Sequence, residues 1–136
     1  MQFSISTTTG VAIYQQLSAQ ICAAIARGRL RPHERLPSVR ELSQRLVVNP
    51  NTIARAYTEL ERDGTLYTRP GMGVFVSAVR PALAPAERRE RLLKPLDALL
   101  VDAVRLGCAP DEVLEMVRWR MGEFEWSQAA GQAAKE

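Results

Sequence analysis

The side chains best suited to reading a nucleic acid lie in one polar run, Asn49-Pro50-Asn51-Thr52, and in Arg55 just after it. In the major groove of DNA, asparagine can pair with adenine, arginine can bracket guanine, and a threonine methyl can contact thymine. The same run marks a helix start, because asparagine accepts hydrogen bonds from the first amides of a helix and proline fits its first position. We therefore predict that Asn51, Thr52 and Arg55 read bases from a helix that opens at Asn49. Taken alone, the run favours an ordinary helix cap, and the elements around it reverse that preference.

A second set of residues is suited to binding phosphates. Ser38 and Arg40 stand at the start of an earlier predicted helix, whereas Arg69, Gly71 and Gly73 form the tip of a predicted hairpin. Positive charge and backbone amides hold a protein on the DNA backbone but carry little sequence information. Glycine also lets the backbone come close to DNA and adopt unusual torsions. We predict phosphate contacts from all five residues. An ion pair with a neighbouring glutamate is the alternative for Arg40, and an ordinary surface hairpin is the alternative for the tip.

Three predicted helices must position these residues. Apolar residues at helical spacing, with Tyr14 in the same stripe, predict the first helix over Ile13–Gly28. Ser38 stands three residues ahead of Glu41, and this capping-box spacing predicts the start of the second helix. The third runs over Pro50–Gly64 with its apolar residues on one face. A tight turn is expected between the second and the third helix.

A hairpin and a linker follow the third helix. Two short runs rich in strand-forming residues, 66–68 and 74–76, predict a β-hairpin. Three helices followed by a hairpin are the parts of a winged helix-turn-helix. We therefore expect a mostly α fold with a small β-hairpin, in which a winged helix-turn-helix precedes a short two-helix dimerisation unit. The predicted domains are a DNA-binding domain (1–79), a linker (80–85), a helical dimerisation domain (86–126) and a flexible tail (127–136).

The predicted dimerisation domain consists of two apolar helices. One is expected to end at Gly107 and the other to begin at Pro110, and Pro95 should kink the first helix or restart it. Together the helices carry more apolar surface than one chain can cover, so we expect a second copy to cover it. A twofold dimer would present two recognition helices to a near-palindromic DNA site. The predicted dimerisation residues are Leu92, Leu96, Leu99, Leu100, Val104, Val113, Val117, Met121 and Phe124.

Composition narrows the class of protein. Lys and Arg exceed Asp and Glu by three, which favours polyanionic partners. No segment is apolar enough to span a membrane, so we expect no membrane partner and a cytoplasmic location. Cys22 and Cys108 lie outside any metal-binding spacing and His33 lacks clustered carboxylates, so we expect no metal, no cofactor and buried, reduced thiols. No nucleophile is spaced beside a suitable base, so an enzyme is not expected.

Several stretches of the chain resemble the DNA-binding domain of the GntR family of bacterial regulators, over roughly residues 11 to 77. They are Leu36–Ser43, Val48–Thr52, Arg55–Tyr57, Glu59–Glu61, Asp63-Gly64 and Thr68–Val76. The short helical remainder resembles the YtrA subfamily, which implies dimerisation through this tail and repression of nearby genes, often genes for ABC transporters. The resemblance also implies DNA contacts at Arg40, Asn51, Thr52, Arg55 and the wing around Arg69–Gly73.

The chain departs from the family pattern at three positions. Pro50 and Ala54 stand where some branches of the family have arginines in the recognition helix, so base specificity from those branches is not carried over. His33 stands where a glycine is usual, so we expect a differently shaped turn before the second helix.

These observations predict a sequence-specific transcriptional regulator without catalytic activity. We expect a repressor that binds a near-palindromic operator in double-stranded DNA as a homodimer, with a transporter operon as its implied target. The alternative is a winged-helix module that binds a protein partner with the same surface. A small-molecule effector, bound at the dimer interface or between the domains, is left open.

Overall fold

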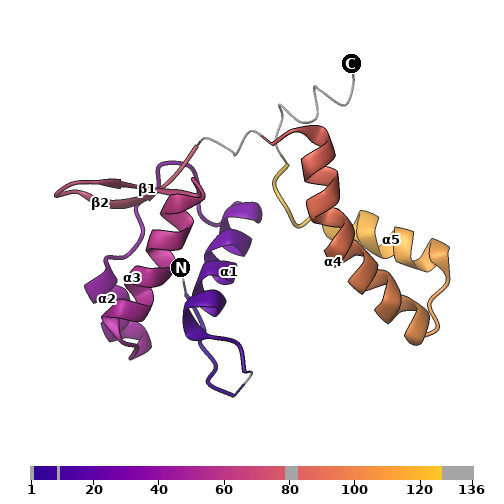
Figure 1. Cartoon of the computed structure of the whole chain (residues 1–136), viewed down its shortest axis with the longest axis horizontal. Helices are drawn as coiled ribbons and strands as arrows, with labels where there is room; N and C mark the ends of the chain where they lie inside the picture. The colour runs from indigo at the N-terminus through magenta and orange to yellow at the C-terminus, as the bar shows by residue number, and fades with distance from the viewer. Residues whose placement is uncertain (1, 9, 79–82, 127–136) are drawn as a thin grey trace. The chain divides into compact units, whose positions relative to one another are not determined.

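The computed structural model describes residues 2–8, 10–78 and 83–126. The chain forms two compact units, one built mainly from the N-terminal part and the other from Ala82–Phe124 (Figure 1). The first unit contains three helices and a β-hairpin, and the second contains two helices. The predicted tail (127–136) and the first half of the predicted linker (80–82) lie outside the described residues.

The helices of the first unit are α1 (Ile13–Ala26), α2 (Val39–Leu46) and α3 (Pro50–Arg62). Both predicted capping residues are confirmed by hydrogen bonds. The Ser38 hydroxyl accepts from the backbone N–H of Glu41 at 3.0 Å, and the Asn49 side-chain oxygen accepts from the backbone N–H of Asn51 at 2.8 Å. Because these bonds satisfy amides that have no partner inside the helix, they define where α2 and α3 begin.

The core of this unit lies where α1, α2 and α3 meet. Leu17, Ile21, Leu42 and Ile53 are completely buried there. Tyr57 joins the same core, and its hydroxyl donates to the carbonyl of Pro37 at 2.7 Å. Burial and the nearby Glu41 carboxylate raise the pKa of Tyr57, so the hydroxyl stays protonated and keeps donating. This bond ties α3 to the start of α2.

The turn between α2 and α3 contains an unfavourable torsion. Val47 ends α2 in the left-handed conformation with a φ of 54°, and its side chain is 90% exposed. A β-branched side chain in this conformation crowds its own backbone. The turn that orients α3 therefore carries local strain without a packing benefit from the Val47 side chain.

We expect Val47→Gly to raise the free energy of unfolding by about 0.5–1 kcal/mol. Relief of the left-handed torsion stabilises the folded state by about 1–2 kcal/mol. The greater freedom of glycine stabilises the unfolded chain by about 0.5–1 kcal/mol and offsets part of this gain. Urea denaturation would measure the difference. As a control, Val48→Gly should destabilise the protein, because Val48 packs against the core and has no positive φ. A lower midpoint for Val47→Gly would contradict the assignment of strain.

The wing is the antiparallel pair β1 (Leu66–Arg69) and β2 (Gly73–Val76), with Tyr67 opposite Phe75. The predicted hairpin is therefore present. The connector before α2 adds a third line of hydrogen bonds to β2, a pairing that the sequence analysis did not predict. Its bonds run from the N–H of His33 to the Val76 carbonyl (2.7 Å), from the N–H of Val76 to the Glu34 carbonyl (2.9 Å), and from the N–H of Leu36 to the Val74 carbonyl (2.8 Å).

His33 retains the torsion that a glycine would accommodate. Its φ is 67°, in the left-handed region. The ring Nδ1 lies 2.8 Å from the Tyr67 hydroxyl, and the backbone N–H bonds to Val76. The replacement of the usual glycine thus leaves the backbone in a glycine-like conformation, and contacts with the wing hold it there.

The second unit contains α4 (Pro85–Arg105) and α5 (Pro110–Met121). Pro85 is already helical, although the predicted linker includes it, and α4 continues through Pro95 instead of restarting there. Gly107, with a φ of 80°, follows α4, and the N–H of Cys108 bonds back to the Ala103 carbonyl at 2.9 Å. This arrangement closes the helix as a glycine-based C-terminal cap.

The cysteines differ from expectation. Cys22 is exposed on α1 and Cys108 is half-buried, so the prediction that both thiols are buried is wrong. The reason is that Cys22 lies beside the apolar stripe of α1 and not within it. Partial desolvation of the sulfur and the Asp63 carboxylate raise the pKa of the Cys22 thiol.

Among the described residues, no helix is long and apolar enough to cross a bilayer.

Candidate nucleic-acid interface

The outer face of α3 presents the predicted base-reading residues. Ile53 and Tyr57 turn into the core, which leaves Asn51 and Arg55 exposed one turn apart and Thr52 half-buried. Residues four apart lie on the same side of a helix, so Asn51 and Arg55 share one surface. The structure therefore brings two of the three predicted readers together on the outer face.

Asn49 and Pro50 build the start of this helix. The Asn49 side chain is occupied as a cap, and Pro50 is the first helical residue. Both are exposed, and the free N–H groups of a helix start form a site that favours anions. Their predicted contribution to a DNA interface is therefore indirect: they set the position of the backbone N–H groups at the start of α3.

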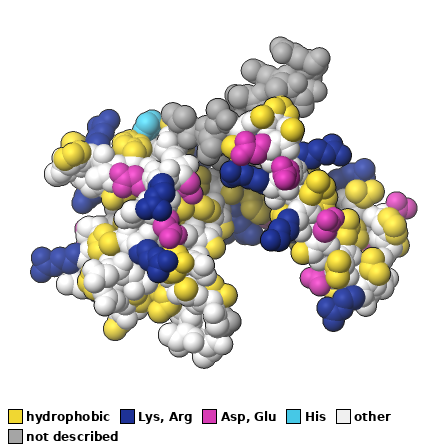
Figure 2. All heavy atoms as spheres, viewed as in Figure 1, with side chains coloured by type: hydrophobic (Ala, Val, Ile, Leu, Met, Phe, Trp, Pro, Cys, Tyr) yellow, Lys and Arg dark blue, Asp and Glu magenta, His cyan; other side chains and the backbone are white. Residues whose placement is uncertain are grey.

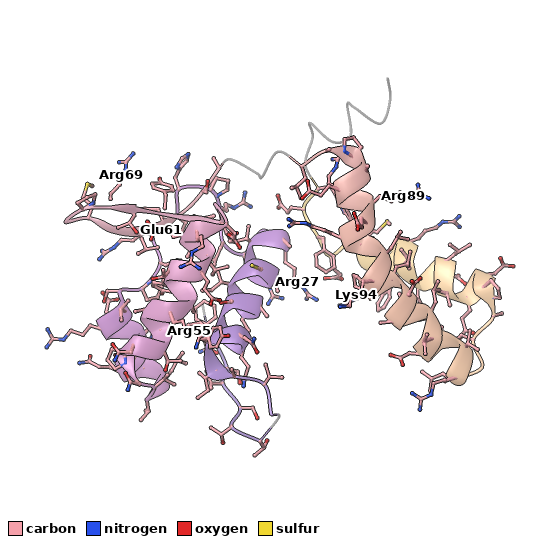
Figure 3. The ribbon with its side chains drawn as sticks, viewed as in Figure 1. Arg27, Arg55, Glu61, Arg69, Arg89 and Lys94 are labelled. Carbon is pink, nitrogen blue, oxygen red and sulfur yellow. The ribbon has the colours of Figure 1, made fainter. Side chains whose placement is uncertain are left out.

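Arg55 makes two contacts in the free protein. Its guanidinium carbon lies 3.8 Å from the centre of the Tyr14 ring, and its Nε lies 3.6 Å from a carboxylate oxygen of Glu59. Figure 3 shows Arg55 between α3 and α1. The side chain is nevertheless 60% exposed. The sequence analysis assigned Tyr14 to the apolar stripe of α1, and no local signal shows that this ring lies against Arg55.

Ser38 and Arg40 occupy the start of α2. Ser38 is half-buried, and its hydroxyl is used by the helix cap. Arg40 is exposed, and within the part of the chain that the structure describes it forms no ion pair. The alternative interpretation, an ion pair of Arg40 with Glu41 or Glu59, is therefore wrong for the described residues: neither pair forms, and Glu59 pairs with Arg55.

The wing carries cationic and aromatic side chains on one face. Arg69 lies over the rings of Tyr67 and Phe75, at 5.9 Å and 6.0 Å from their centres, and it is exposed on the hairpin (Figure 3). Tyr67 stacks on Phe75 at 5.5 Å. At these distances the rings attract the guanidinium of Arg69 and leave its N–H groups available.

The two wing glycines have different roles. Gly71, with a φ of 76°, supplies the torsion of the turn, and a β-carbon there would meet nothing within 4 Å. Gly73, with a φ of 123°, makes room for Arg35, because a β-carbon there would lie 2.8 Å from the Arg35 Nε. Arg35 is an exposed cation beside the wing that the sequence analysis missed.

The second unit exposes most of its apolar side chains. Leu92 is 66% exposed and Val104 is 77% exposed, and Figure 2 shows hydrophobic side chains among the charged ones on this unit. Of the predicted dimerisation residues, Val113 is buried within the chain, so it has little surface to offer a partner. Val117 and Phe124 are half-buried. The remaining predicted residues, all exposed, are Leu92, Leu96, Leu99, Leu100, Val104 and Met121.

Further large apolar side chains on this unit are exposed. Leu106 is 80% exposed, Trp119 is 68% exposed and Leu114 is 53% exposed. The apolar surface on α4 and α5 is therefore wider than a single helical stripe.

Known proteins of similar sequence are regulators. The profile of the family described as "Bacterial regulatory proteins, gntR family" matches residues 13–76. The transcriptional repressor YtrA of Bacillus subtilis is 31% identical over 114 residues, which span 84% of this chain and 88% of the repressor. The transcriptional regulator Rv1152 of Mycobacterium tuberculosis is 34% identical over 113 residues, which span 79% of this chain and 93% of that protein.

Solved structures show the same similarity over most of the chain. A Listeria monocytogenes protein described as a transcriptional antiterminator aligns with a TM-score of 0.71 at 30% identity, covering 87% of this chain and 88% of its own. YtrA from Sulfolobus acidocaldarius, a GntR-family transcription factor, aligns with a TM-score of 0.52 at 27% identity, covering 89% and 97%. The predicted fold class and family resemblance are thereby confirmed. The chain belongs to the GntR family of bacterial regulatory proteins, with an N-terminal winged helix-turn-helix and a helical C-terminal part.

Proposed function

We propose that this transcriptional regulator represses its target genes by binding a near-palindromic operator as a homodimer. The observation that carries the proposal is the outer face of α3, where Asn51 and Arg55 stand exposed over a core that holds the helix rigid. An α-helix fits the major groove, where these two side chains can make paired hydrogen bonds to adenine and to guanine.

In this proposal, α3 reads bases and its neighbours bind phosphates. Thr52 is the third reader, next to Asn51 on the first turn of the helix. Arg40 and Arg69 are exposed cations on either side of α3 in the sequence, and each can neutralise a phosphate. Arg35 joins this group as an exposed cation that the Gly73 backbone accommodates.

The homodimer is supported by the second unit. Large apolar side chains remain exposed along both α4 and α5, and their burial against a second copy would contribute roughly 25 cal/mol per Å². Twofold symmetry would then present two copies of α3, which suits half-sites about one turn of DNA apart. Nearby transporter genes are the targets that the resemblance to YtrA implies.

The direct test is an electrophoretic shift with DNA from the gene's own upstream region, repeated with excess random DNA. A shifted band that survives the competitor supports the proposal. If random DNA removes the band completely, or if no band forms, the sequence-specific function is refuted. The other candidate, a winged-helix module that binds a protein partner, would then be preferred.

We expect Arg69→Ala to weaken binding to every DNA sequence and to lower the slope of log affinity against log salt by about one. The reason is that a phosphate contact releases a condensed counterion whatever the bases are. Fluorescence anisotropy at several salt concentrations measures the slope. Arg118→Ala removes the same charge from an exposed position on α5 and should leave the slope unchanged. An Arg69→Ala slope equal to that of the parent would remove the wing from the interface.

A further inference from the structure

Arg55 is held from two sides before any DNA is present. The Tyr14 ring of α1 covers one face of its guanidinium at 3.8 Å, and Glu59, one turn further along α3, attracts its Nε at 3.6 Å. Residues of two helices, Tyr14 of α1 and Glu59 of α3, thus meet at the Arg55 side chain.

The stacking leaves the arginine able to bind. A guanidinium is planar, and its N–H groups point outward from the edge of the plane, whereas the ring covers its face. The Nε to carboxylate distance exceeds a hydrogen-bond length, so Glu59 contributes attraction without taking a donor. With 60% of the side chain exposed, the terminal N–H groups of Arg55 remain open to an acceptor.

The Tyr14 ring is well placed to impose this arrangement. Tyr14 lies in the first turn of α1, half-buried and packed against the core, so its own position is fixed by the fold. Its hydroxyl contacts only the exposed Gln15 side chain among the described contacts, at 3.3 Å. The aromatic ring, and not the hydroxyl, is therefore the part of Tyr14 that acts on Arg55.

We propose that Tyr14 is a positioning residue for DNA reading: it restricts Arg55 to a conformation from which the guanidinium can bracket a guanine. A long side chain that is already ordered loses less freedom on binding, which strengthens the contact that it makes. The proposal rests on the proposed operator-binding function. It adds a residue of α1 to the determinants of sequence preference, although α1 itself does not have to touch a base.

The test compares the affinity for an operator fragment with the affinity for random duplex DNA, using the full chain and its variants. Arg55→Ala should reduce the ratio of the two affinities about 5- to 150-fold, the range expected for one lost paired contact to a base. Tyr14→Leu, which keeps an apolar side chain but removes the ring, should reduce the same ratio about 3- to 10-fold and leave affinity for random DNA unchanged. Tyr14→Phe keeps the ring and should match the parent.

The double variant makes the test specific. If Tyr14 acts through Arg55, Tyr14→Leu combined with Arg55→Ala should be no worse than Arg55→Ala alone, because the positioned group is already gone. Arg55→Lys, which keeps the charge but lacks the planar fork, should lose preference like Arg55→Ala. Thermal denaturation of each variant identifies any loss of folding, which would lower both affinities together.

Three outcomes would overturn this inference: an unchanged ratio for Tyr14→Leu, additive losses in the double variant, or an unchanged ratio for Arg55→Ala. Each leaves the parent protein's preference for its operator intact, so the proposed function would survive. A parent protein with no preference for any DNA sequence would instead refute the proposed function, and this inference with it.

Discussion

Replacing Leu96 and Leu99 with glutamate is expected to convert the protein from a dimer to a monomer and to lower operator affinity by about 100-fold or more. Both side chains are 45% exposed on α4, within the apolar surface that we propose a second copy covers. Two buried carboxylates without partners would oppose association. A monomer then loses the second recognition helix, which in the dimer binds at a high effective concentration.

The control for this variant is Lys94→Glu. It changes the charge by the same amount as the two leucine substitutions together, and Lys94 lies on the opposite side of α4 from Leu92 and Leu96. Sedimentation velocity should find a dimer for the control and a monomer for the double variant. A double variant that remains dimeric, or a monomer with undiminished operator affinity, would contradict the proposed assembly.

We also expect Asn51→Ala to weaken binding to the operator strongly. Loss of a paired contact to adenine should cost about 1–3 kcal/mol on the operator, which is roughly a 5- to 150-fold weaker affinity, with little change on random DNA. The helix should remain intact, because the backbone N–H of residue 51 still donates to the Asn49 cap.

The neighbouring asparagine provides the matched control. Asn49→Ala removes the cap of α3 and should lower the free energy of unfolding by about 1 kcal/mol. Its effect on binding should be similar for operator and random DNA, since no base contact is lost. An Asn51→Ala variant that weakens binding to both DNAs equally would make Asn51 a phosphate contact instead of a reader.

Local signals explain why most of the fold could be predicted from the sequence. A cap such as Ser38 or Asn49 acts on amides two or three residues away, so the residues that define it are adjacent in the chain. The wing is likewise a short-range structure, with its two strands joined by a turn of glycine and proline. In these cases the sequence contains both partners of the interaction within one short window.

Interactions between distant residues could not be predicted in the same way. The pairing of the connector at His33–Leu36 with β2, the Arg35 side chain over Gly73, and the Tyr14 ring on Arg55 each join residues that only the folded chain brings together. Hydrophobic spacing predicted that Tyr14 faces the bundle, but it does not distinguish a ring that fills the core from one that also stacks on an arginine at its edge. The structure therefore differs more from the predicted site than from the predicted fold.

The exposure of Cys22 and the continuity of α4 have their own physical reasons. A residue at the edge of a helical stripe borders both the core and the solvent, so spacing alone is a poor guide to burial there. A proline inside a helix removes one hydrogen bond, yet a long amphipathic helix can tolerate that loss, as α4 does at Pro95.

Selection of DNA fragments bound by the purified protein from its own genome, followed by footprinting of the enriched fragments, tests the central claim most directly. We expect a small number of enriched sites, each protected over two half-sites related by twofold symmetry and separated by about one turn of DNA. Retention of fragments without any shared sequence, or protection of a single half-site by the dimer, would contradict the proposal that paired α3 helices read an operator.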